Sequence, residues 1–115
     1  MIENLNGLCN VEITLLAKDN VKPGSPVEIE DKYTVCVPSL NSRFMGICTS
    51  VNGKYATIVT SGIVTVPYSG SNIVLGYNTL SSDGNGKLKF DLNGDVYIPV
   101  LDMDEENGLI TILLK

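Results

Sequence analysis

Hydrophobic residues recur at every second position along much of the chain, which is the period of a β-strand with two different faces. Leu88, Phe90 and Leu92 alternate with charged residues in the clearest case, and Val11, Ile13 and Leu15 repeat the pattern near the start of the chain. Three further segments are rich in β-branched and aromatic residues, which suit a pleated surface: 33–37, 63–66 and 97–101. These patterns predict strands.

Turn signals separate the predicted strands. The pair Asn-Gly occurs five times, and it favours hairpin turns of type I′, in which both central residues have positive φ. We therefore expect a hairpin that joins 55–59 to the strand before it. Two more are expected, one joining 88–92 to 96–101 and one joining 96–101 to 109–114. No segment has apolar residues spaced three and four positions apart, as an amphipathic helix would, and at most a single helical turn fits near 102–107.

Short strands at regular spacing with glycine-rich turns are typical of an all-β protein, either a small antiparallel β-barrel or a sandwich with short hairpins. The length of 115 residues suits a single domain. We expect residues 1–10 to form an N-terminal arm, with Leu5 and Leu8 as anchors, and residues 11–115 to form the barrel domain.

Two predicted strands, 96–101 ("VYIPVL") and 109–114 ("LITILL"), are apolar on both faces. A free-standing antiparallel sheet usually has one polar face. These strands are therefore expected either at the centre of a closed barrel or against another subunit.

Charge and cysteine content narrow the class of protein. The net charge of −5, with no basic patch, argues against nucleic acid and anionic membranes as partners. No stretch approaches the roughly 20 apolar residues of a membrane span, and the first residues lack a signal-peptide pattern. Three cysteines without a C-x-x-C pair favour reduced thiols in a cytoplasm over a disulfide framework.

The segment "SDGNGK" (82–87) resembles a calcium-binding loop in its Asp83 and Asn85, and a phosphate-binding loop in its two glycines. A calcium loop that began at Asp83 would need glycine at its sixth position and glutamate at its twelfth, where this chain has Leu88 and Gly94. A phosphate loop would continue into a helix, and here a strand is predicted. A tight turn explains these residues better.

The other candidate catalytic and metal-binding residues also have simpler structural explanations. The acidic residues at 102 and 104–106 could pair as catalytic carboxylates or hold a hard metal, but an exposed hairpin loop explains them better. Histidine is absent, which removes the commonest general base, and Cys36 and Cys48 lie in apolar strands as inert thiols. We expect no enzyme, and neither catalytic, cofactor-binding nor metal-binding residues.

Tyr68 and Tyr77 could stack on a sugar or on a single nucleic-acid strand, although a structural role is the better interpretation of each. Together with Leu5 and Leu8 they are the candidate partner-binding residues.

The segment 61–90 resembles the capsid decoration, or head cement, proteins of tailed phages and prophages. The matching features are a glycine that opens a strand, "VPYSG", "GYN" and "DGNGK": Gly62, Val66–Gly70, Gly76–Asn78 and Asp83–Lys87. The segments "VKPGSPVEI" near the start and "YIPVLDMD" with "ITILL" near the end extend the resemblance over most of the chain from about residue 20.

The resemblance implies a small β-barrel without enzymatic activity that binds the major capsid protein at capsomer junctions, often as a homotrimer. Such a protein would lie on the capsid exterior, after a period in the bacterial host cytoplasm. Two other functions remain open. One is a carbohydrate- or peptide-binding β-module that uses Tyr68, Tyr77 or a sheet edge. The other is a different structural part of a phage head or tail.

Overall fold

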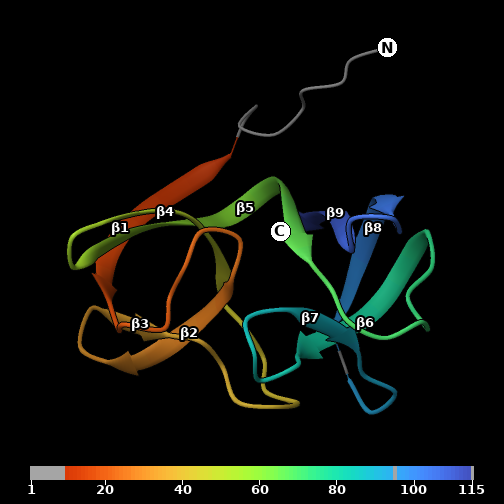
Figure 1. Cartoon of the computed structure of the whole chain (residues 1–115), viewed down its shortest axis with the longest axis horizontal. Helices are drawn as coiled ribbons and strands as arrows, with labels where there is room; N and C mark the ends of the chain where they lie inside the picture. The colour runs from red at the N-terminus through yellow and green to blue at the C-terminus, as the bar shows by residue number, and fades with distance from the viewer. Residues whose placement is uncertain (1–9, 95, 115) are drawn as a thin grey trace.

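The computed structural model describes residues 10–94 and 96–114, which form nine β-strands and no α-helix (Figure 1). The expected all-β class is confirmed. Leu5 and Leu8 lie outside the described residues, as does most of the expected N-terminal arm. The strands are β1 (Val11–Ala17), β2 (Pro26–Asp31), β3 (Thr34–Cys36), β4 (Gly46–Asn52), β5 (Tyr55–Pro67), β6 (Gly76–Ser82), β7 (Leu88–Phe90), β8 (Tyr97–Asp104) and β9 (Leu109–Leu114).

The first five strands close into a barrel. They are bonded in the order β1-β3-β2-β4-β5, and β5 pairs again with β1 to complete the ring. The pairing of β1 with β3 is parallel, with Leu16 opposite Thr34, and the other pairings are antiparallel. The sequence had suggested an antiparallel barrel, and the parallel pairing of β1 with β3 departs from that expectation.

The remaining strands form a second lobe around the far half of β5. The order there is β5-β9-β8-β6-β7, and a single parallel bridge between Tyr68 and Leu88 brings β7 back to the end of β5. The 13-residue strand β5 thus belongs to both lobes, as Figure 1 shows. Gly62, with φ of +124°, lies where β5 passes from one lobe to the other.

Each lobe has its own apolar core. The smaller core fills the first barrel and contains Val27, Val35 and Ile58, among others. The larger core lies mainly in the second lobe, with Val66, Ile110 and Ile112 near its centre. Neighbouring residues of one strand serve both cores, since Ile58 belongs to the smaller cluster and Val59 to the larger one.

One predicted hairpin is wrong. β7 pairs with β6 and not with β8, because the chain leaves the sheet after Phe90 and β8 binds the other edge of β6. Leu92, expected to share the face of Leu88, is 83% exposed in the connecting loop. The hairpins β4–β5 and β8–β9 are confirmed.

Two local expectations also change. In the β4–β5 hairpin, Asn52 pairs with Tyr55, so the two loop residues are Gly53 and Lys54 rather than Asn52 and Gly53. Of these two, only Gly53 has positive φ, which matches a type II′ turn instead of type I′. Strand β8 continues to Asp104, and the residues before Leu109 form a turn without a helix.

Candidate interaction site

The segment "SDGNGK" is a structural loop between β6 and β7. The Asp83 carboxylate accepts hydrogen bonds from the backbone N–H groups of Asn85 (2.7 Å) and Lys87 (3.0 Å), and from the Ser69 hydroxyl (3.1 Å). The carboxylate is therefore used by the loop itself. The turn interpretation is supported, and no group of three or more potential metal ligands occurs among the described residues.

The acidic residues near the β8–β9 turn also serve local structure. The Asp104 carboxylate accepts hydrogen bonds from the backbone N–H (3.2 Å) and the side-chain amide (2.8 Å) of Asn107. Asp102 accepts one from the N–H of Met103 (2.8 Å). All of these side chains are exposed, as an exposed hairpin loop requires.

The two described cysteines are free thiols. Cys48 is buried in the smaller core, and burial raises the pKa of its thiol. The pKa of Cys36 is raised by burial and then by the nearby carboxylates of Glu30 and Glu28. A raised pKa keeps a thiol protonated at neutral pH, so neither group is set up as a nucleophile.

The two tyrosines singled out in the sequence lie in different environments. Tyr68 is half-buried and packs against the larger core, and its N–H donates a hydrogen bond to the carbonyl of Gly108 (3.0 Å). Tyr77 is 68% exposed on β6. The structure therefore does not bring them together, and the structural interpretation fits Tyr68 but not Tyr77.

Tyr77 belongs to the outward side of the second lobe. It lies opposite Pro99 on β8, and Leu113 on β9 lies opposite Ile63 on β5. Because Val100 pairs with Ile112, Pro99 and Leu113 are neighbours as well, so these four residues form one row across four strands. Tyr97 is 69% exposed and lies one diagonal step from Tyr77 on the same side.

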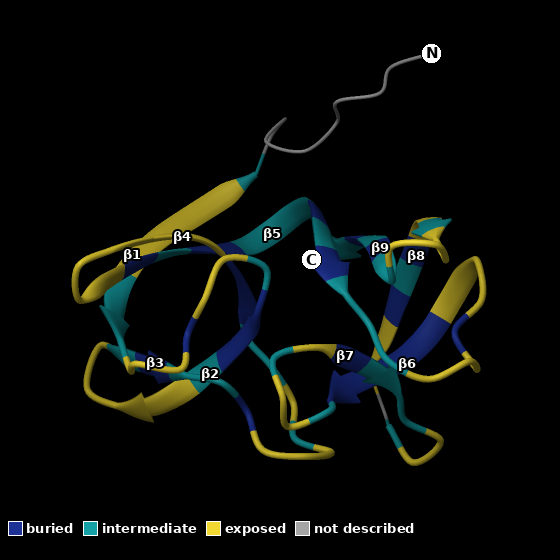
Figure 2. Ribbon diagram, viewed as in Figure 1, coloured by how far each residue is buried: buried dark blue, intermediate teal, exposed yellow. Residues whose placement is uncertain are grey.

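We call this surface the outer face. Its residues alternate along each strand with those of the larger core: Ile63, Thr65, Tyr77, Tyr97, Pro99, Leu101, Thr111 and Leu113. Of these residues, Tyr77, Tyr97 and Leu101 are exposed. Figure 2 shows how β6 begins exposed and becomes buried along its length.

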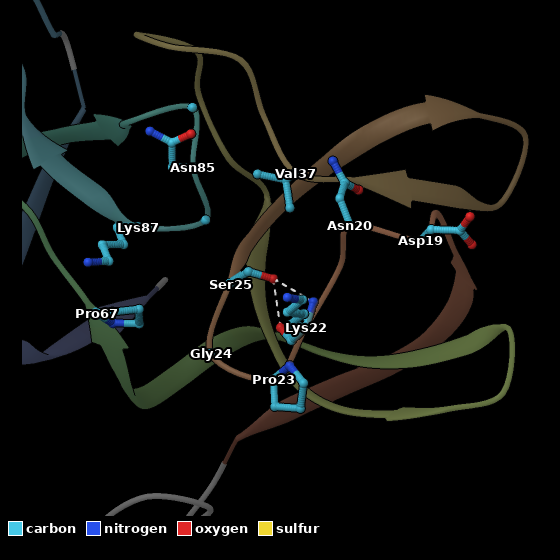
Figure 3. Close-up of a pocket in the computed structure, with 12 residues that line it drawn as sticks. Asp19, Asn20, Lys22, Pro23, Gly24, Ser25, Val37, Pro67, Asn85 and Lys87 are labelled. Atoms are coloured by element: carbon cyan, nitrogen blue, oxygen red, sulfur yellow. Dashed lines mark hydrogen bonds between the residues drawn. The ribbon is translucent and has the colours of Figure 1, made fainter.

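A cleft of about 670 Å³ lies between the two lobes. Figure 3 shows Lys22 and Pro23 of the first lobe on one side, and Pro67 and Lys87 on the other. The Ser25 hydroxyl lies between them and donates a hydrogen bond to the Lys22 carbonyl (2.7 Å). The lining residues include one carboxylate, Asp19, and two lysines, Lys22 and Lys87, but no pair of carboxylates and no cysteine.

Sequence reasoning identified Tyr77 but missed Tyr97, Leu101 and Pro99, which share its surface. The signal was present in the two-sided apolar pattern of 96–101 and 109–114. One side of these strands forms the larger core, and the other side is the outer face.

No helix among the described residues is long and apolar enough to cross a membrane. No family model matches the chain, and no curated protein matches it. Its fold is similar to that of a solved structure, the N base of the head fiber gp8.5 in bacteriophage phi29, with a TM-score of 0.66 and 20% sequence identity. The alignment covers 92% of this chain and 94% of the other.

Proposed function

We propose that this protein is a non-enzymatic structural component of a tailed-phage or prophage virion. It lies on the capsid exterior, binds the major capsid protein at capsomer junctions and stabilises the shell. The observation that carries the proposal is the fold likeness to the base of a phage head fiber, which extends over nearly the whole of both chains. The decoration-protein motifs of 61–90 point independently to the same part of a virion.

The physical properties of the chain suit such a role. A decoration protein acts by binding only the assembled shell, and it thereby stabilises that state by mass action. It needs a rigid body with a surface for attachment, and it needs no acid, base or metal. Two packed lobes that share one long strand supply the rigidity. We further propose that the protein acts as a homo-oligomer, as decoration proteins often do, with three copies expected.

The test is binding to heads of the phage or prophage that encodes the chain. Heads lacking the protein are incubated with it and examined by electron microscopy, and their loss of DNA on heating is measured. We expect added density at junctions between capsomers and DNA release at a higher temperature. Heads that show neither density nor stabilisation would contradict the proposal.

A carbohydrate-binding module is the second candidate, since Tyr77 and Tyr97 are exposed on one sheet face with Pro99 between them. Exposed aromatic rings on a flat surface can stack on sugar rings. Retention on a polysaccharide column that is lost in Tyr77→Ala, without any binding to heads, would favour this function.

A further inference from the structure

The outer face carries a group of exposed apolar residues. Of the fourteen large hydrophobic side chains that are exposed among the described residues, Tyr77, Tyr97 and Leu101 lie together on it. Contiguous apolar patches on soluble proteins mark interaction sites, whereas single exposed apolar residues are ordinary. This patch continues inward through the half-buried Ile63, Pro99 and Leu113.

The outer face also lacks charge at its centre. The strand segments that form it, residues 62–67, 76–79, 97–101 and 109–114, contain no Asp, Glu, Lys or Arg. Asp102 lies opposite Thr111 at the end of β8, so one carboxylate stands at the margin of the face. Depletion of charge with enrichment of tyrosine is the composition of a protein–protein interface core.

We propose that the outer face is the surface through which copies of this chain associate. The inference rests on the homo-oligomer of the proposed function and assigns the residues that form its interface. Tyr77, Tyr97, Pro99 and Leu113 form the central contacts, and Leu101 extends them along β8.

The occupant is a second copy because the face is complementary to itself. The polar side chains at its centre carry hydroxyls. Those of Thr65 and Thr111 bond to each other (3.1 Å), and the exposed Tyr77 and Tyr97 carry the two that a second copy would meet. A hydroxyl both donates and accepts hydrogen bonds, so a hydroxyl-bearing face can pair with an identical one. A charged face cannot do so, since like charges repel. In a chain of net charge −5, two copies meet with least repulsion through this uncharged region.

The size of the face limits how tightly it can hold a second copy. Four strands spaced about 4.8 Å apart and six residues of about 3.3 Å rise give a flat extent of roughly 14 Å by 17 Å, or about 240 Å² before side-chain relief is added. A stable interface buries about 800 Å² on each partner, so the face supplies only the centre of such an interface. We therefore expect weak association, which sedimentation over a wide concentration range can measure.

The experiment compares the intact chain with Tyr77→Lys and Leu101→Lys by sedimentation equilibrium over a wide concentration range. Both side chains are exposed, so the fold is retained. Each substitution also reduces the net negative charge, which by itself would favour association. We expect the intact chain to form an oligomer and each variant to need at least about thirty-fold higher concentration for the same association, the loss typical of an interface hot spot.

Tyr55→Lys and Ile29→Lys are the matched controls, since these residues are 48% and 55% exposed on the first barrel. They should associate like the intact chain. A variant lacking residues 1–9 is measured alongside. An intact chain that remains monomeric at high concentration would overturn the inference, and so would an oligomer that dissociates only in the controls or only on loss of residues 1–9.

Binding to heads separates this inference from the proposed function. If Tyr77→Lys is monomeric and the intact oligomer does not bind heads, the interface stands and the virion role fails. If the intact chain binds heads as a monomer and Tyr77→Lys abolishes that binding, the face meets the shell and the copy-to-copy interface fails.

Discussion

At the scale of single residues, Tyr33 is held in an unfavourable backbone conformation. Its φ is +51°, in the left-handed region, where a side chain that lacks the compensating hydrogen bonds of Asn or Asp costs about 1 kcal/mol. The residue occupies the tip of the β2–β3 hairpin, and its carbonyl accepts a hydrogen bond from the N–H of Leu16 (2.8 Å). The ring is 78% exposed and so contributes little packing.

We predict that Tyr33→Asn stabilises the protein by about 0.5–1 kcal/mol, because asparagine tolerates positive φ and little packing is lost. Urea unfolding followed by circular dichroism measures the change. Tyr33→Phe is the control, since it keeps the strained conformation, and it should leave the stability unchanged. A destabilised Tyr33→Asn variant would mean that the tyrosine ring makes a stabilising contact.

For single residues, the sequence predicted the role of a side chain where a local motif constrains it. It did not predict whether a side chain faces the core or the surface where that depends on how distant strands pair. The glycine-rich loop at 82–87 was identified as a turn because its spacing violates the rules for a calcium site. Tyr68 and Tyr77 were grouped as equivalent because nothing local distinguishes them. Only the bridge between Tyr68 and Leu88, and the pairing of Tyr77 with Pro99, place one ring at the core and the other on the surface.

At the scale of elements, the β6–β7 connection depends on one carboxylate. Asp83 accepts two backbone hydrogen bonds within the loop and a third from the Ser69 hydroxyl, which also ties the loop to the segment after β5. The contact that closes the second lobe lies beside this loop, since the N–H of Ser69 donates a hydrogen bond to the carbonyl of Leu88 in β7 (2.9 Å).

We predict that Asp83→Ala destabilises the protein by about 1–2 kcal/mol, because two backbone N–H groups lose their acceptor. Asp83→Asn retains an oxygen in the same position and should cost less than about 0.5 kcal/mol. Calcium should not raise the melting temperature of either variant or of the intact chain. A calcium-dependent rise in the intact chain that disappears in Asp83→Asn would instead identify a metal site.

The strands themselves were largely predictable, and their neighbours were less so. Alternating apolar residues identified β1 and β7, β-branched residues identified the second half of β5, and turn pairs identified the β4–β5 and β8–β9 hairpins. Sequence adjacency then suggested that β7 pairs with β8. That prediction is wrong because the three-residue strand β7 ends at Phe90, and the Asp91 N–H donates a hydrogen bond to the Thr79 carbonyl of β6 (2.9 Å). The parallel contact of β1 with β3 joins segments that no local signal connects.

At the scale of the whole molecule, the two lobes are joined by shared strands rather than by a linker. β5 contributes Ile58 to the smaller core and Val64 to the larger one, and β4 divides Cys48 and Ile47 in the same way. A lobe that unfolded alone would expose side chains that its neighbour needs. The two cores are therefore expected to unfold together.

We predict a single cooperative unfolding transition. Ile58→Val in the first core and Ile112→Val in the second should each lower the stability of both lobes equally, by about 1 kcal/mol. Native-state hydrogen exchange of the slowest amides in β3 and β8 measures each lobe separately. If a substitution lowered the protection of its own lobe only, the lobes would be independent folding units.

The first and last strands end against consecutive residues of β5, with Val11 opposite Ser61 and Leu114 opposite Gly62. A linker could join β9 directly to β1 in place of the residues beyond them, and the exposed stretch Gly70–Asn72 could be opened to give new termini. Every strand of such a circular permutant would keep its neighbours. We therefore expect the fold to depend on which strands pair, and not on where along the chain the termini lie.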